Sequence, residues 1–444
     1  MGVATLSLLL VLLGFLSAYS LPLHGGEAVA TNDLTSQTQQ IGRHKAEVAH
    51  AWFTLASDLV KSEKWIPPNA ARLFGYLGIT LYESIVPGTS NLRSLAGQIN
   101  GLSNLPEVGT IEYHWPTVAN SAAATAMRSF FSTAKGASLR AIDDLQRSNE
   151  EANPLWADED VARRSKEFGQ LIAIAIFEWS LRDGYLDIND CEYTLPSGAG
   201  IWRPTPPMYA PPLQPCWGKL RTFVIENGAD CAPVPPPPYS ENDSSRLFKE
   251  MSEVYTVGHT LTDEQKTIAR YWADNPGKTA SPAGHSIAIL TQALRATNAS
   301  LAVAAEAYAK VGMAVADAFI ACWWAKYEYN LLRPVTYIRE QIDASWTPFL
   351  MTPEFPEYTS GHSAQAAAAA AVLTALFGRN FAFTDRTHES RGIAPRSFKS
   401  FSEAADESAI SRLYGGIHYR AAIDEGLRQG KCVGDRINLL KITE

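Results

Sequence analysis

Three short stretches near the C-terminal end carry histidines and basic residues at spacings suited to catalysis. The first is FPEYTSGHSAQAAAAAA, residues 355–371, where Ser360, Gly361 and His362 precede a run of alanines. Alanine favours helix most strongly, so a helix should begin here. Its first N–H groups lack intrahelical partners and carry partial positive charge, which suits a bound anion. Taken alone, the stretch is also explained by a cap at Thr359 or Ser360 with His362 on a solvated first turn.

The second stretch is WWAKYEYNLLRPV, residues 323–335, which contains two cations. In a continuous helix Lys326 and Arg333 are seven residues apart and project from one face. Two aligned cations repel each other unless an anion lies between them. Pro334 should end or kink the helix and place Arg333 at a boundary. A solvated basic edge is the alternative interpretation.

The third stretch is SRLYGGIHYRAAIDEG, residues 411–426, with Arg412 six residues before His418. That spacing corresponds to about 240° of rotation on a helix, so one helix cannot present both on one face. Gly415 and Gly416 lie between them and can supply a break that turns both inward. A helix C-cap followed by an ordinary histidine remains the alternative.

Together the three stretches supply what a tetrahedral oxyanion needs. Lysine and two arginines neutralise its charge, a serine hydroxyl and a glycine N–H donate to its oxygens, and two histidines can bond to the central atom and move protons. The whole chain has a net charge of −8, which argues against nucleic-acid or membrane-surface partners. The anion must therefore be held by a local basic pocket.

The elements that position these residues are predicted to be helices. The chain is 46% hydrophobic and 19% charged over 444 residues, enough for a substantial core. We expect a mostly α protein, with two packed four-helix bundles and the oxyanion site in the C-terminal one. The expected halves are residues 21–240, which end in a proline-rich loop, and residues 241–444. Helical patterns cover residues 40–62, 69–86, 118–147, 157–184, 243–256, 261–273, 283–330, 361–377, 400–413 and 419–432.

Residues 1–20 contain no charge and resemble a signal peptide, so we expect a secreted or periplasmic protein with no membrane span in the mature chain. Because the usual lysine or arginine is missing at the start, an uncleaved anchor stays open. In an exported protein Cys216 and Cys231 could close the proline-rich loop as a disulfide. Cys322 would then be a buried free thiol.

The three stretches as a set resemble a known signature. K-x6-RP at 326–334, SGH at 360–362 and SR-x5-H at 411–418 are similar to the motifs shared by vanadium-dependent haloperoxidases and type 2 phosphatidic-acid-phosphatase-like acid phosphatases. Trp323 and Phe355 resemble halide-site residues of the haloperoxidase branch. The chain looks most similar to bacterial enzymes of that branch, including iodoperoxidases.

This resemblance implies a vanadate cofactor and a role for each matching residue. His418 would bond to vanadium, His362 would be the acid–base group, and Asp274, in YWADNPG, would be the carboxylate that supports it. The cofactor's oxygens would be held by Lys326, Arg333, Ser360, Gly361 and Arg412.

The activity implied is that of an enzyme that oxidises halide with hydrogen peroxide to hypohalous acid. Iodide is the safest expected halide, and bromide is a second candidate. Thr359 replaces the usual proline before SGH, and Ala422 stands where the phosphatase pattern has an aspartate. Asp424 is the nearest carboxylate to that position, so the orienting partner of His418 stays open.

Two alternatives use the same pocket. In an acid phosphatase His418 would attack phosphorus and His362 would protonate the leaving group. Phosphate and vanadate have nearly the same shape and charge, so the oxyanion residues do not separate the two activities; the missing aspartate at 422 weakens the phosphatase. The third hypothesis is a non-catalytic oxyanion-binding protein.

Overall fold

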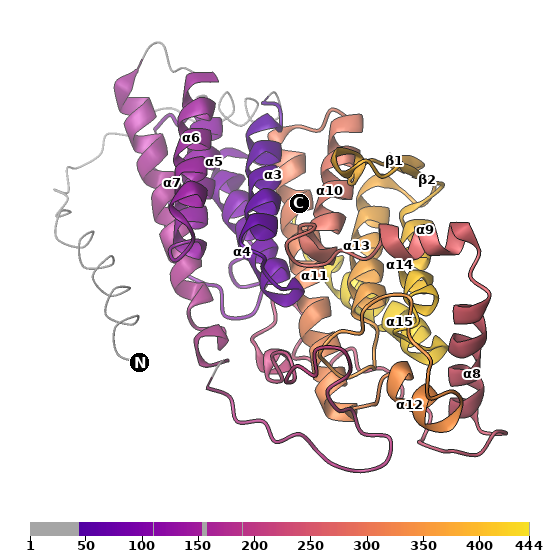
Figure 1. Ribbon diagram of the computed structural model, residues 1–444. Helices are drawn as coiled ribbons and strands as arrows, with labels where there is room; N and C mark the ends of the chain where they lie inside the picture. Colours follow the sequence, from indigo (N-terminus) through magenta and orange to yellow (C-terminus); the bar gives the residue numbers. More distant parts are fainter. Residues whose placement is uncertain (1–43, 110, 153–157, 189, 444) are drawn as a thin grey trace. The chain divides into compact units, whose positions relative to one another are not determined.

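Helices make up nearly all the regular structure that is described (Figure 1). The computed structural model describes residues 44–109, 111–152, 158–188 and 190–443, so the predicted signal peptide, residues 1–20, lies outside the described residues. The helices before the proline-rich segment are α3 (Glu47–Ser62), α4 (Pro67–Ile85), α5 (Trp115–Phe130), α6 (Gly136–Ala152) and α7 (Glu159–Ser180). Those after it are α8 (Arg246–His259), α9 (Asp263–Tyr271), α10 (Ser281–Ala296), α11 (Leu301–Tyr329), α12 (Pro334–Gln341), α13 (Gly361–Phe377), α14 (Phe401–Tyr414) and α15 (Arg420–Ile437).

The prediction of a mostly α protein is therefore confirmed. Short 3-10 turns lie at Val86–Gly88, Tyr185–Asp187, Trp217–Lys219 and Glu389–Arg391. In the described residues the regular strands are β1 (Phe383–Asp385) and β2 (Arg396–Phe398), which pair antiparallel with Phe383 opposite Phe398. This hairpin and α12 were not predicted, because each is too short to show a period in the sequence.

Two helices that were each predicted as one are divided in the structure. Residues 283–330 form α10 and α11, because Asn298 takes a left-handed conformation with φ +49° and Ser300 caps α11. Residues 118–147 form α5 and α6, which are separated by a turn at residues 131–135.

Helix α11 is the central element of the described fold. Its sequence is rich in alanine and apolar on every side, and most of its residues are buried, as expected for a helix surrounded by others. It packs against α4, α13 and α15 (Figure 1). At Gly312 a Cβ atom would lie 2.4 Å from the carbonyl oxygen of Phe74, so glycine permits the close approach of α4. Helix α4 in turn packs against α5 and α7.

One continuous set of buried apolar side chains runs through both halves of the chain. It includes Trp52 and Leu77 before the proline-rich segment and Ala314 and Val372 after it. All the described residues group as one unit by their contacts. The two halves therefore share a core.

The proline-rich segment, residues 190–240, is held to the end of the core that carries the site. Asp317, buried in α11, accepts hydrogen bonds from the backbone N–H groups of Phe223, Val224 and Ile225. The N–H of Leu213 donates to the carbonyl of Glu354. This irregular segment therefore covers the loop that leads into α13.

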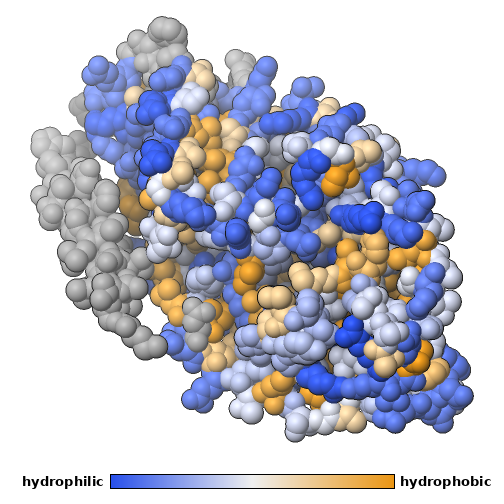
Figure 2. Space-filling view, viewed as in Figure 1, coloured by the Kyte–Doolittle hydropathy of each residue, from blue (hydrophilic) through white to orange (hydrophobic). Residues whose placement is uncertain are grey.

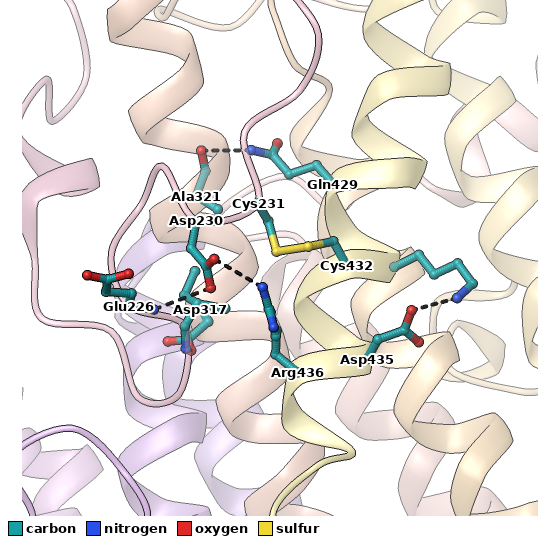
Figure 3. The surroundings of a disulfide bond; sticks show 11 residues. Glu226, Asp230, Cys231, Asp317, Ala321, Gln429, Cys432, Asp435 and Arg436 are labelled. Atoms are coloured by element: carbon teal, nitrogen blue, oxygen red, sulfur yellow. Dashed lines mark hydrogen bonds and ion pairs between the residues drawn. A yellow bond between two sulfur atoms is a disulfide. The ribbon is translucent and has the colours of Figure 1, made fainter.

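Two disulfides fasten the same segment. Cys191 pairs with Cys216, and Cys231 pairs with Cys432 on α15 (Figure 3). The expected Cys216–Cys231 bond is wrong, because a cysteine distant in sequence, on α15, lies beside Cys231. Cys322 is a buried free thiol, as predicted.

The outer face shown in Figure 2 is mainly hydrophilic, with hydrophobic side chains in small separate groups. Among the described helices, none is long and apolar enough to cross a membrane.

Candidate oxyanion site

The predicted oxyanion residues reach one region from four different elements. Lys326 lies in the last turn of α11, and Arg333 is the N-cap residue of α12. Ser360 caps α13, and Arg412 lies in the last turn of α14. His418 follows the Gly415–Gly416 break, where Gly416 has φ +74°.

The expected common helix face for Lys326 and Arg333 is wrong. Helix α11 ends at Tyr329 because Asn330 turns left-handed, with φ +47°. The two cations therefore approach from separate elements. They meet because the chain reverses between them.

All three cations are buried. Lys326 and Arg333 are 0% exposed and Arg412 is 2% exposed. Burial lowers the pKa of Lys326 to about 8 and the pKa values of Arg333 and Arg412 to about 10. Buried charges of one sign are costly unless they are compensated. An anion bound among the three cations would supply that compensation.

The two cations nearest His418 also hold the surrounding loops. Nζ of Lys326 donates to the carbonyl oxygens of Pro356 and Glu357, at 3.0 Å each, and to that of Thr359. Arg333 donates from Nε to the carbonyl of Phe355 at 2.8 Å. Its Nη2 is buried and finds no hydrogen-bond partner among the described residues. This guanidinium nitrogen is free to donate to an oxyanion.

His418 is held in one tautomer by its two neighbours. Its Nδ1 lies 2.7 Å from Oε1 of Glu357, and its Nε2 lies 3.2 Å from Nη1 of Arg333. Because the carboxylate accepts and the guanidinium donates, we assign the proton to Nδ1 and a lone pair to Nε2. Burial and the charges of Arg333 and Lys326 hold the pKa of His418 well below its usual range. The neutral imidazole therefore has a nitrogen ready to bond to an electrophilic centre.

Glu357 is the carboxylate that orients His418, which the sequence did not identify. It is fully buried, and besides His418 it accepts from the N–H of Tyr419 at 3.2 Å. Burial raises the pKa of Glu357 to about 8, although Arg333 and Lys326 oppose the shift. Sequence reasoning missed this residue because it searched after the histidine, near Ala422 and Asp424. The available signal was a carboxylate inside FPEYTSGH itself.

His362 occupies the first turn of α13. Its Nε2 is buried without a hydrogen-bond partner in the part of the chain described, and the backbone of Trp272 bonds to its ring. Burial and the charge of Arg412 hold the pKa of His362 well below its usual range. The ring is thus a neutral base at ordinary pH. Ser360 caps the helix as the simpler interpretation proposed, by accepting from the N–H of Ser363 at 3.3 Å.

Asp274 is placed differently from the other predicted residues. Its carboxylate accepts a hydrogen bond from Nδ1 of His285 at 2.8 Å, and the structure gives it no such bond to His362 among the described contacts. Its charge nevertheless raises the pKa values of both His362 and Arg412, after the larger opposing effect of burial. Asp274 thus acts on His362 through space.

Two aromatic rings, Trp323 and Phe355, form an apolar wall beside the cations. The ring centroids of Trp323 and Phe355 lie 5.0 Å apart. The Phe355 ring lies 5.0 Å from Nζ of Lys326 and 4.8 Å from Cζ of Arg333, within the range of cation–π attraction. This wall puts an apolar, polarisable surface beside the cations.

Whether a vanadate group fits here depends on the atoms that have no hydrogen-bond partner. Nη2 of Arg333 would donate to an oxygen of the group, and the N-terminus of α13 would add N–H groups. His418 Nε2 would bond to the metal, and His362 Nε2 would exchange a proton with one of the oxygens. The unpartnered donor and the two ring nitrogens therefore fit an oxyanion such as vanadate.

Comparison with known proteins identifies relatives. A family model described as the VCPO second helical-bundle domain matches residues 306–441. The crystal structure of the first bacterial vanadium-dependent iodoperoxidase is 40% identical, with a TM-score of 0.84, over 90% of this chain and 97% of that one.

Two bacterial vanadium-dependent chloroperoxidase structures share the fold. The holo-type structure is 14% identical with a TM-score of 0.63, over 94% of this chain and 98% of that one. The apo-type structure is 15% identical with a TM-score of 0.62, over 86% and 94%. No curated protein sequence is significantly similar to this chain.

Proposed function

Because this chain belongs to the vanadium-dependent haloperoxidases, we propose that it binds vanadate and oxidises halide with hydrogen peroxide to hypohalous acid, with iodide as its principal substrate. The observation that carries the proposal is the neutral His418, whose Nε2 lone pair lies beside Arg333 in a region with three buried cations. Iodide is the halide most easily oxidised, and the 40% identical structure is an iodoperoxidase.

Each protein group has a part that follows from its position. His418 would hold the metal, and Lys326, Arg333 and Arg412 would hold its oxygens together with Ser360 and the N–H of Gly361. Vanadate, when bound, supplies a Lewis acid that activates peroxide without changing its own oxidation state.

The proton chemistry falls to His362. Its pKa is lowered by burial and by Arg412, so the ring is neutral and accepts a proton from incoming peroxide. Asp274 opposes that shift through its negative charge and keeps the ring basic enough for the task. The Trp323–Phe355 wall would contact the halide, because a large, weakly hydrated anion is attracted to an apolar surface next to cations.

The structure removes one argument against the phosphatase alternative. Glu357 supplies the orienting carboxylate that Ala422 lacks, so the missing aspartate no longer argues against a phosphoryl nucleophile. What favours the peroxidase is the family and the aromatic wall beside Lys326.

Reconstitution separates these activities. Metal-free protein loaded with orthovanadate should oxidise iodide in the presence of peroxide, and protein loaded with phosphate should not. Efficient turnover of p-nitrophenyl phosphate, with vanadate acting only as an inhibitor, would refute the proposal. His259→Ala is a matched control, because this exposed histidine bonds to the carbonyl of its neighbour Tyr255 and to no oxyanion-site residue among those described.

We also propose that the enzyme is exported. The two disulfides support this, since such bonds persist in oxidising compartments. Fractionation of expressing cells tests it, and retention of active enzyme in the cytoplasm would contradict it.

A further inference from the structure

A second cluster of ionisable side chains adjoins the oxyanion site. We call it the His–Asp cluster; its members are Asp274, His285, Asp385 and His388. Asp274 precedes α10, His285 lies on α10, Asp385 ends β1 and His388 follows in the next loop. All four are buried, with at most 3% of any residue exposed. The oxyanion mechanism uses only the charge of Asp274, so the other three have no assigned role.

His285 lies between two carboxylates. Its Nδ1 is 2.8 Å from Oδ2 of Asp274, and its Nε2 is 2.7 Å from Oδ2 of Asp385. The ring of His285 is therefore fixed between two buried carboxylates.

Two atoms of the cluster are left without hydrogen bonds. Oδ1 of Asp274 and Nε2 of His388 are both buried and unpartnered among the described residues. They lie 3.4 Å apart, beyond a good hydrogen bond. Together with His285, they bring one carboxylate oxygen and two ring nitrogens within 4.8 Å of one another.

A cavity adjoins these atoms. It has a volume of about 430 Å³ and lies between α3, α10 and residues 386–391, and Asp274, His285 and His388 are among its lining residues. The cavity can hold the water molecules or small anion that would complete a coordination shell.

From this arrangement we propose that Asp274, His285 and His388 bind one divalent transition-metal ion of the zinc class, separate from vanadate. Two imidazoles and a carboxylate are a donor set for such ions, whereas Mg²⁺ and Ca²⁺ select oxygen ligands. The ligand atoms are Nδ1 of His285, Nε2 of His388 and the Asp274 carboxylate. The proposal does not depend on the halide chemistry of the first site.

Asp385 is already placed as the outer partner of such a ligand. A metal-binding histidine usually donates its second N–H to a carboxylate, as His285 Nε2 does here. Asp385 is itself fixed by the hydroxyl of Tyr271 at 2.8 Å and the N–H of Thr387 at 2.9 Å.

The charges and protons of the cluster also balance with the ion bound. When the metal binds, His285 loses its Nδ1 proton to solvent, and the divalent charge offsets both carboxylates. Binding through Nε2 of His388 puts that ring's proton on Nδ1. The exposed Arg391, which now contacts Nδ1 at 3.3 Å, then turns away.

Equilibrium dialysis with Zn²⁺ tests the site. Chelator-treated protein, saturated with orthovanadate to occupy the first site, should retain about one zinc per chain. His388→Ala should weaken zinc binding by at least about 100-fold, and His259→Ala, which changes an exposed histidine, should bind as the wild type does. Zinc should also raise the melting temperature of wild-type protein but not that of His388→Ala.

Failure of the wild-type protein to retain zinc would overturn the proposal, and so would full retention by His388→Ala. If that variant does not fold, the spectrum of Co²⁺ added to wild-type protein decides. A four- or five-coordinate site gives visible absorption much stronger than that of hydrated Co²⁺. A spectrum identical to that of the hydrated ion would refute the proposal.

Discussion

Replacing Glu357 by alanine should weaken vanadate binding without unfolding the protein. Glu357 is the acceptor for Nδ1–H of His418 at 2.7 Å, and no other group among the described residues bonds to that nitrogen. With alanine the donor is left buried and unpaired. The ring then loses the group that fixes its orientation, so Nε2 is no longer held in position to bond to vanadium.

The size of the effect follows from the lost hydrogen bond. A buried donor without its partner costs about 1–3 kcal/mol, and each 1.4 kcal/mol is roughly a factor of ten in affinity. We therefore expect the Kd for vanadate to rise by about 5- to 150-fold in Glu357→Ala. The same range is usual when the outer partner of a metal-binding histidine is removed.

Glu357→Gln separates orientation from charge. Glutamine keeps a side-chain oxygen that accepts from Nδ1–H, so the tautomer is preserved although the group can no longer ionise. We expect Glu357→Gln to bind vanadate far more tightly than Glu357→Ala. Glu328→Ala is a second control, because Glu328 lies near Lys326 in the sequence and is exposed.

The assay is a titration of metal-free protein with orthovanadate, followed by iodide oxidation at saturating peroxide. Circular dichroism and the melting temperature confirm that each variant is folded. Wild-type affinity in Glu357→Ala would refute the reasoning. Equal weakening in the alanine and glutamine variants would show that charge, and not the tautomer, controls the site.

Four further predictions test other parts of the structure. His362→Ala should still bind vanadate but lose most iodide turnover, because proton transfer contributes about 10²- to 10⁴-fold; unchanged kcat would contradict its role. Burial lowers the pKa of Lys326 to about 8 in the anion-free protein, so raising the pH from 7 to 9.5 should neutralise this side chain and weaken vanadate binding. Lys326→Arg should show a smaller pH effect, and equal pH dependence in both proteins would exclude Lys326 as the cause. Gly430→Ala should destabilise the fold by about 1–3 kcal/mol, because the new Cβ atom would lie 1.9 Å from the carbonyl oxygen of Ala364. Thermal unfolding measures the loss of stability, and an unchanged melting temperature would show that α15 shifts freely. Cys231→Ser should cost about 2–4 kcal/mol by removing a crosslink that spans 201 residues. Denaturant titration measures this loss, Cys432→Ser should show an equal loss, and unchanged stability in both variants would contradict the prediction.

The helical part of the fold could be read from local signals. The alanine run predicted residues 361–377, which is the extent of α13, because alanine has high helix propensity and Ser360 supplies a cap. The sequence did not predict that the long helix ends at Asn330. A left-handed asparagine looks like any other asparagine in a sequence, and only its packing shows that the chain reverses there.

The cysteine prediction failed for a related reason. Cys216 and Cys231 are close in sequence, and loop closure favours short loops only slightly. The observed partner of Cys231 is Cys432, which packing of α15 brings beside it from 201 residues away (Figure 3). No pattern of spacing carries that information.

The sequence by itself determined which chemistry the protein could perform. Charges, hydroxyls and histidines in three motifs supply the groups that an oxyanion site needs, because their donors and acceptors are properties of the residues. Tertiary structure alone decided how those groups are tuned. Glu357 orients His418, and Asp274 turns towards His285 instead of His362. Hydrogen-bond partners and burial depend on contacts between distant segments, so they arise only when the helices pack.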